Sequence, residues 1–188
     1  MQAHKEIEIL GDYDEQDNEG TTITIEGALQ APLIHISGGE QADEIRLTSN
    51  ASVTGVAVIE GRGASDVISS AVENQFLNPV LMFGDAVAIV YDRDNRELTS
   101  VTSEAPASTA TNQLTNTGRM AVMVGGTSND TIIGSQFEDW AIGDEATITF
   151  VTDPVALNVL SEVRSLEGNH GTADSIDVGD GNLSLIHI

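Results

Sequence analysis

A nine-residue spacing of glycine, aspartate and aliphatic residues runs through residues 125–142. In a frame that starts at Gly125, Asp130 takes the sixth position and Ile132 the eighth. The next frame repeats this spacing with Gly134, Asp139 and Ala141. Glycine lets a backbone turn sharply, and regularly spaced carboxylates offer oxygen atoms to a cation. The chemistry to consider first is therefore metal binding.

Partial copies of the same spacing occur elsewhere in the chain. They lie at Gly38, Gly39, Asp43 and Ile45, at Gly61, Asp66 and Ile68, and at Asp174 and Ile176. Gly143 opens a third consecutive frame, which lapses because Ile148 stands where aspartate is expected. A last unit begins near the end of the chain with Gly179, Asp180 and Asn182.

These residues resemble the G-G-x-G-x-D-x-U-x nonapeptide of RTX proteins, which form a calcium-binding parallel β-roll. In that pattern the glycine turns and the aspartate form an all-oxygen site that suits Ca²⁺, and the eighth residue points into the core. The resemblance implies Ca²⁺ as the cofactor. It implies a site built from Asp43, Asp66, Gly125, Gly126, Ser128, Asp130, Gly134, Asp139, Gly143, Asp144, Asp174, Gly179, Asp180 and Asn182.

The fourth position departs from the RTX pattern in five of the copies. Where the family has glycine, this chain has Gln41, Ala64, Ser128, Phe137 and Thr172. We therefore expect few calcium ions, bound less tightly than in an ideal roll.

The elements that must position these residues follow a longer repeat. Gly-Asp after an apolar pair occurs at 9–12, 82–85 and 141–144, and an alternating strand follows each copy. In two copies a second strand motif follows, LTSVTS at 98–103 and LSEVRS at 160–165. We expect a hairpin in each of these two, with DRDNRE and VTDPVALNV as turn segments.

Domain organisation follows from these repeats. We expect one degenerate array over residues 1–182, with units that start near 11, 84 and 143. The tail 183–188 fits no frame, because aspartate is expected at 183 and leucine is found. Our hypothesis is that the chain is an internal segment of a longer repeat protein whose last six residues are not native.

Composition restricts the fold and the partners. The chain has 188 residues, with 30 acidic against 7 basic ones and a net charge of −23. This charge argues against nucleic acid and anionic membranes as partners. Aromatic residues make up 4%, and there is no cysteine. Short β-branched runs between glycine-rich and polar turns predict an all-β fold with a thin aliphatic core.

Motifs for other chemistry are missing from the sequence. There is no HExxH, no GxSxG, and GGTSND lacks the Gly-Lys-Ser/Thr ending of a phosphate loop. The acidic stretch 12–19 lacks the central glycine of an EF-hand. We expect His35 on a strand face, and Trp140 facing out of the roll beneath a hairpin. We expect no enzymatic activity.

The predicted fold is all-β: a parallel β-roll or β-helix-like solenoid with hairpin insertions, or else a β-sandwich of the adhesin type. The predicted function is calcium-dependent structure in a secreted or cell-surface bacterial protein, exported by type I secretion as the resemblance implies. Its partners would be calcium, neighbouring repeats and surface glycans or other cells. The alternative is an adhesive or carbohydrate-binding module, and a metal-free halophilic fold is a further explanation of the acidity.

Overall fold

The computed structural model describes residues 6–11, 19–75, 78–92, 97–104, 110–153, 157–166, 173–177, 179 and 184–186. Every regular element in these ranges is a β-strand, so the prediction of an all-β fold is confirmed. The strands form three sheets, called A, B and C below. No helix in the described ranges is long and apolar enough to cross a membrane.

Sheets A and B are parallel, and the chain alternates between them. Sheet A contains β1 (Glu6–Leu10), β3 (Ala28–Gly39), β5 (Ser52–Arg62), β8 (Val80–Phe83), β12 (Ala121–Val124), β14 (Trp140–Ile142) and β18 (Ser184–Ile186), with the short β7 (Asn74–Gln75) beside β5. Sheet B contains β2 (Thr22–Ile25), β4 (Glu44–Leu47), β6 (Val67–Ser70), β11 (Gln113–Asn116), β13 (Thr131–Ile133) and β17 (Ser175–Asp177). Neighbours within a sheet are thus strands from successive passes of the chain.

Stacked aliphatic columns fill the space between sheets A and B. Register in sheet B aligns Ile23, Ile45, Ile68, Leu114, Ile132 and Ile176. Register in sheet A aligns Ile9, Ile36, Ile59, Met82, Met123 and Ala141. The members of both columns form one buried cluster, against which the half-buried Ile9 and Ile176 pack. The eighth residue of the frame therefore points into the core, as predicted, because alternate residues of a strand face opposite sides.

Sheet C is antiparallel and is made by the two hairpins. They are β9 (Val87–Tyr91) with β10 (Leu98–Ser103), and β15 (Ala146–Asp153) with β16 (Leu157–Ser165). β10 and β15 join them into the order β16-β15-β10-β9. The prediction of a hairpin after Gly84 and after Gly143 is confirmed.

Some details of these insertions differ from the sequence prediction. The sequence predicts a turn over 151–159, but residues 151–153 and 157–159 extend β15 and β16, because strand pairing continues to the pair Asp153–Leu157. Residues 93–96, in the other expected turn, lie outside the described part. The sequence predicts that the tail fits no nine-residue frame, whereas in the structure Ser184–Ile186 pair in parallel with β14 at the edge of sheet A.

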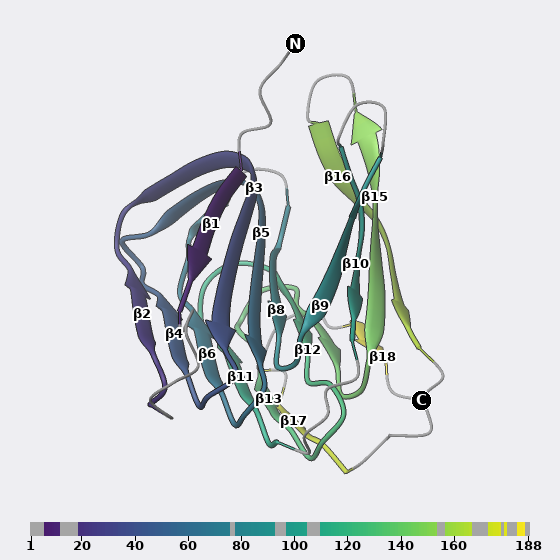
Figure 1. Cartoon of the computed structure of the whole chain (residues 1–188). Helices are drawn as coiled ribbons and strands as arrows, with labels where there is room; N and C mark the ends of the chain where they lie inside the picture. Colours follow the sequence, from purple (N-terminus) through teal and green to yellow (C-terminus); the bar gives the residue numbers. More distant parts are fainter. Residues whose placement is uncertain are drawn as a thin grey trace.

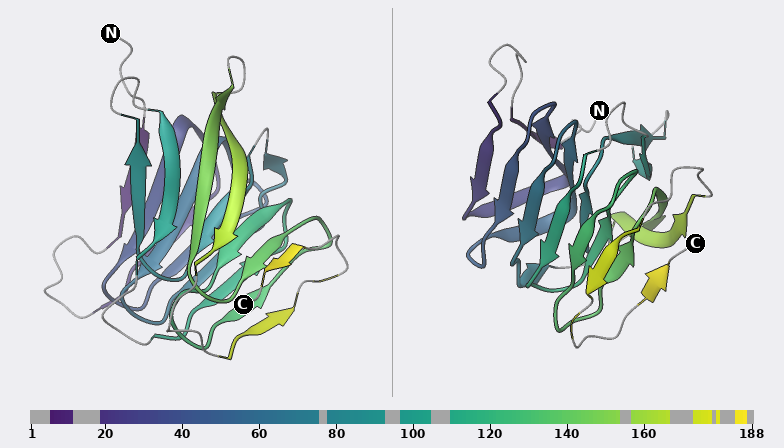
Figure 2. Two further views of the ribbon diagram at one scale, coloured as in Figure 1. Left: turned by 90° about the vertical axis from the view of Figure 1, so that its right-hand side faces the viewer. Right: turned by 90° about the horizontal axis from the view of Figure 1, so that it is seen from below.

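The three sheets form three layers. Sheet A lies in the middle, with sheet B on one side and sheet C on the other (Figure 1). The left-hand view of Figure 2 shows the hairpins side by side in front of sheet A. A second buried cluster joins sheet A to sheet C, and it includes Val58, Phe83, Val101 and Ile148. Trp140 packs against this cluster, as expected of a tryptophan covered by a hairpin.

Candidate metal centre

A ladder of side chains runs along one end of sheet B. Each of its members is the residue directly before a sheet B strand, so the parallel register stacks them in one column. The members of this aspartate ladder are Asp43, Asp66, Asn112, Asp130 and Asp174. Strands in a sheet are about 4.8 Å apart, so five polar side chains follow one another at close range.

Backbone hydrogen bonds fix one oxygen of every ladder member. The Oδ1 atom of each accepts the N–H of the residue one strand earlier in the column. The pairs are Thr21 to Asp43 (2.5 Å), Asp43 to Asp66 (2.8 Å), Asp66 to Asn112 (3.0 Å), Asn112 to Asp130 (2.7 Å) and Asp130 to Asp174 (2.9 Å). The second side-chain atom of each member is therefore directed away from the ladder's own backbone.

That second atom faces a column of glycines at the ends of the sheet A strands. This glycine column consists of Gly38, Gly61, Gly84, Gly125 and Gly143. A Cβ atom on Gly125 would lie 2.7 Å from Asp130 Oδ2 and 2.4 Å from Gly143 O. A Cβ atom on each of the other four glycines would likewise crowd the facing ladder residue, which is Asp43, Asp66, Asn112 or Asp174. These positions need glycine for space, because the facing side chain occupies the place of a Cβ.

The second glycine of the motif has a different role. Gly39 and Gly126 have φ of 139° and 111°, values that side chains rarely adopt. Gly126 follows Gly125 directly, so one motif combines a glycine needed for close approach with one needed for its backbone angle.

Asp66 and Asp130 are two ladder carboxyl groups whose pKa values are strongly raised. Each is 1% exposed, and the Oδ2 atom of each has no hydrogen-bond partner among the described residues. Burial raises the pKa of Asp66 to about 8, and the charges of Asp43 and Asp85 add to this. Burial also raises the pKa of Asp130 to about 7, with the charges of Asp174 and Asp85 adding to it. Each carboxylate therefore needs a proton or a cation to be accommodated.

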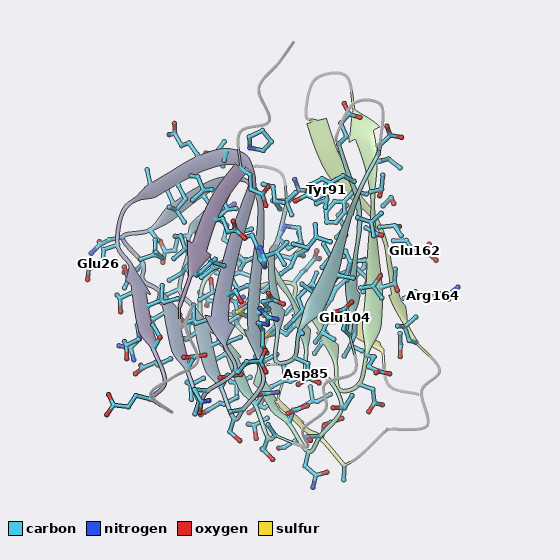
Figure 3. All side chains as sticks on the ribbon, in the orientation of Figure 1. Glu26, Asp85, Tyr91, Glu104, Glu162 and Arg164 are labelled. Atoms are coloured by element: carbon cyan, nitrogen blue, oxygen red, sulfur yellow. The ribbon has the colours of Figure 1, made fainter. Side chains whose placement is uncertain are left out.

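Two members of this region were missed by sequence reasoning. Asp85 follows Gly84 and is buried, and burial raises its pKa. Figure 3 shows it at the end of sheet A, where the first hairpin leaves. Asn112 takes the place of a ladder aspartate. The stretch Asn112–Thr115 does carry the sixth-to-eighth spacing, with Leu114 as its aliphatic residue. The hairpin insertion separates it from its glycine, Gly84, so no nine-residue frame contains both.

Asp139 lies elsewhere, at the start of a sheet A strand and thus at the opposite turns. Its Oδ1 accepts the N–H of Ala121 (2.8 Å) and the amide of Asn116 (2.8 Å), and its Oδ2 accepts the N–H of Ser135 (2.6 Å). Gly134 lies at the same turns, where its N–H donates to Asp177 O. The structure does not bring Asp139 together with Asp130.

The remaining candidates lie at four different places. Ser128 is buried near Asp130, and its backbone hydrogen bond lowers the pKa of that carboxyl in part. Asp144 follows Gly143 and has a buried Oδ1 without a partner in the described part of the chain. Gly179 lies near Ser135 with φ of 65°. Asp180 and Asn182 lie outside the described residues.

The ladder differs from a site made of converging side chains. Within the described ranges, no three Asp, Glu or His side chains are grouped so that they could hold a metal ion. A cation at the ladder would therefore need backbone oxygens besides carboxylates. Comparisons with protein-family models, with curated proteins and with solved structures give no match.

Proposed function

We propose that this chain is a calcium-binding structural repeat segment of a secreted or cell-surface bacterial protein. Sheets A and B would form an imperfect β-roll that carries two hairpin insertions, and calcium would stabilise the fold. The observation that supports this most directly is the pair of buried carboxylates, Asp66 and Asp130, each with an unpartnered oxygen. The extracellular location follows from the resemblance to RTX proteins.

Neither Asp66 nor Asp130 forms an ion pair with a described residue, and the chain has 7 basic residues in all. A buried ionised carboxylate without a partner is costly, so the group takes up a proton or binds a cation. At a pH above the pKa of about 8 for Asp66, protonation no longer neutralises this carboxylate, which leaves cation binding.

The donor set around these carboxylates fits Ca²⁺. Asp43, Asp66, Asp130 and Asp174 offer carboxylate oxygens, and the glycine column offers backbone carbonyls at the same turns. The carbonyls of Gly84 and Gly143 accept one N–H each, from Arg62 and Gly126, which leaves each a second lone pair. Ca²⁺ accepts six to eight oxygens in flexible geometry, whereas Mg²⁺ demands a regular octahedron.

Binding would act through folding. Stacked carboxylates repel one another, so the loss of a shared cation would destabilise the turns that carry the aspartate ladder. Because the site forms only when sheets A and B are paired, the free energy of calcium binding adds to the free energy of folding.

The test is a calcium titration of the chain after dialysis against a chelator. Circular dichroism and thermal unfolding are followed in CaCl₂, in MgCl₂ and in KCl at matched ionic strength. We expect a gain of β signal and of Tm that is specific to calcium, and a smaller gain in a chain carrying Asp66→Asn and Asp130→Asn. Equal stabilisation by KCl would favour a halophilic fold without metal and contradict the proposal.

A further inference from the structure

Asn112 is the only ladder member that carries no carboxylate, and its orientation is fixed. Its Oδ1 accepts the N–H of Asp66 at 3.0 Å, so the other terminal atom must be the amide nitrogen. We call each ladder residue with the glycine that faces it a row, so that Asn112 and Gly84 form the central row. In the central row Nδ2 lies against the glycine, whereas the neighbouring rows have a carboxylate oxygen there. This Nδ2 donates a hydrogen bond to Asp85 Oδ1 at 3.3 Å.

Asp85 accepts two further hydrogen bonds, both from Thr127. Its Oδ2 accepts the N–H of Thr127 at 2.8 Å and the Oγ1 hydroxyl of Thr127 at 3.1 Å. Together with the amide of Asn112, three neutral donors surround this buried carboxylate. At the central row, hydrogen-bond donors from side chains and backbone thus stabilise the carboxylate, as a bound cation would otherwise do.

We propose that the amide of Asn112 takes the place of a calcium ion at the central row. The ladder would then hold separate calcium sites on either side, one at Asp43 and Asp66 and another at Asp130 and Asp174. This inference rests on the proposed function, and it assigns which rows of the ladder bind metal.

The same arrangement occurs at the opposite turns. There the Nδ2 of Asn116 donates to Asp139 Oδ1 at 2.8 Å, and Asp139 is fully buried with three hydrogen bonds. Asp66 and Asp130 have no such amide beside their Oδ2 atoms. An asparagine amide therefore accompanies the satisfied aspartates, Asp85 and Asp139, and is missing where an oxygen is left unpartnered.

The test counts calcium ions per folded chain, by native mass spectrometry and by equilibrium dialysis. Asn112→Asp removes the amide and places a carboxylate oxygen against Asp85 and Gly84. We expect this variant to bind one more calcium ion than the wild type, and to have a lower Tm than the wild type in chelator. Asn50→Asp adds the same charge on an exposed turn and should bind the wild-type number.

A second variant tests the row without adding charge. Asp85→Asn should bind as many ions as the wild type, because no ion is assigned to Asp85, whereas Asp66→Asn and Asp130→Asn should each lose one. Loss of an ion in Asp85→Asn overturns the inference. So does an Asn112→Asp chain that gains no ion, or that stays unfolded in saturating calcium. A wild-type chain that binds no calcium overturns the proposed function itself, which is a different result.

Discussion

At the scale of single residues, the ladder buries two carboxyl groups, Asp66 and Asp130, that form no ion pair with a described residue. Asp66 and Asp130 keep one oxygen on a backbone N–H and turn the other toward a glycine. Asn112 shows that the same position accepts an amide of equal shape. Charge can therefore be removed from a ladder position with little change in packing.

Asp66→Asn should stabilise the metal-free protein at about pH 9, because it removes a carboxylate that must ionise above a pKa of about 8. An effect of about 1 kcal/mol corresponds to a Tm increase of roughly 2–4 °C for a domain of this size. The gain in Tm on adding calcium should shrink in the same variant. Thermal unfolding in chelator and in calcium measures both. Glu26→Gln, which removes an exposed carboxylate (labelled in Figure 3), is the control and should change neither. A lower Tm in chelator for Asp66→Asn would contradict this account.

Gly125→Ala should destabilise the fold by about 1–3 kcal/mol, because overpacking forces backbone shifts. The new methyl would lie 2.7 Å from Asp130 Oδ2 and 2.4 Å from Gly143 O. Gly27→Ala is the matched control, since nothing lies within 4 Å of its added Cβ. Urea unfolding of both variants distinguishes a loss of space from a general effect of replacing glycine. Equal losses in the two would contradict the close-approach role.

At the scale of elements, the hairpins act as a cover for the outer face of sheet A. Buried residues from β10 and β15 pack on residues from β5 and β8. The buried Glu60 on β5 adds polar links, since its Oε2 accepts the N–H of Val87 at 2.7 Å and its Oε1 lies 3.0 Å from His35 Nε2. Each hairpin follows a Gly-Asp pair, so an aspartate stands in place of the second glycine where the chain leaves the alternation between sheets A and B.

Ile148→Ala should lower the free energy of unfolding by about 2–5 kcal/mol. Ile148 lies on β15 and is fully buried against sheet A, so its truncation leaves a cavity. Trp140, the single tryptophan, packs against the same cluster, so its fluorescence emission should shift to the red in this variant. Val151→Ala on the same strand is the control, because Val151 is 54% exposed. Unchanged emission together with unchanged stability would show that sheet C does not cover sheet A.

At the scale of the whole molecule, the net charge of −23 and the buried carboxylates act in the same direction. Raising the pH ionises the ladder and increases repulsion throughout the chain. The calcium ions of the proposed function would counter both effects, because they bind the oxygens that lose their protons and neutralise the charge.

Without metal, stability should fall as the pH rises from about 4 to about 8. The folded pKa values of Asp66 and Asp130, about 8 and about 7, lie above the ordinary aspartate pKa of 3.8. Groups with a raised folded pKa contribute stability that is complete below the unfolded value and is lost as the pH passes the folded value. In saturating calcium this decline should be reduced or reversed. Tm measured across this range with chelator and with CaCl₂ tests the prediction, and identical slopes would contradict it.

The sequence by itself determined the local features of this protein. Turn residues between β-branched runs specify strands, and the Gly-Asp pairs marked where both hairpins begin. The spacing of aspartate and isoleucine identified Asp66 and Asp130 as site candidates and Ile132 as a core residue. These features depend on neighbours in the chain, so nearby residues suffice to reveal them.

Only the tertiary structure decided which of these residues meet. Asp130 and Asp139 are nine residues apart and look equivalent, yet the alternation between sheets A and B sends them to opposite turns. Gly84 and Asn112 are separated by a hairpin insertion, yet parallel pairing of β11 with β6 and β13 brings Asn112 into the ladder opposite Gly84. Contacts between strands from successive passes are set by sheet register, and register is a property of the assembled sheets. The sequence therefore shows the spacing of the ladder, and the assembled fold determines its membership.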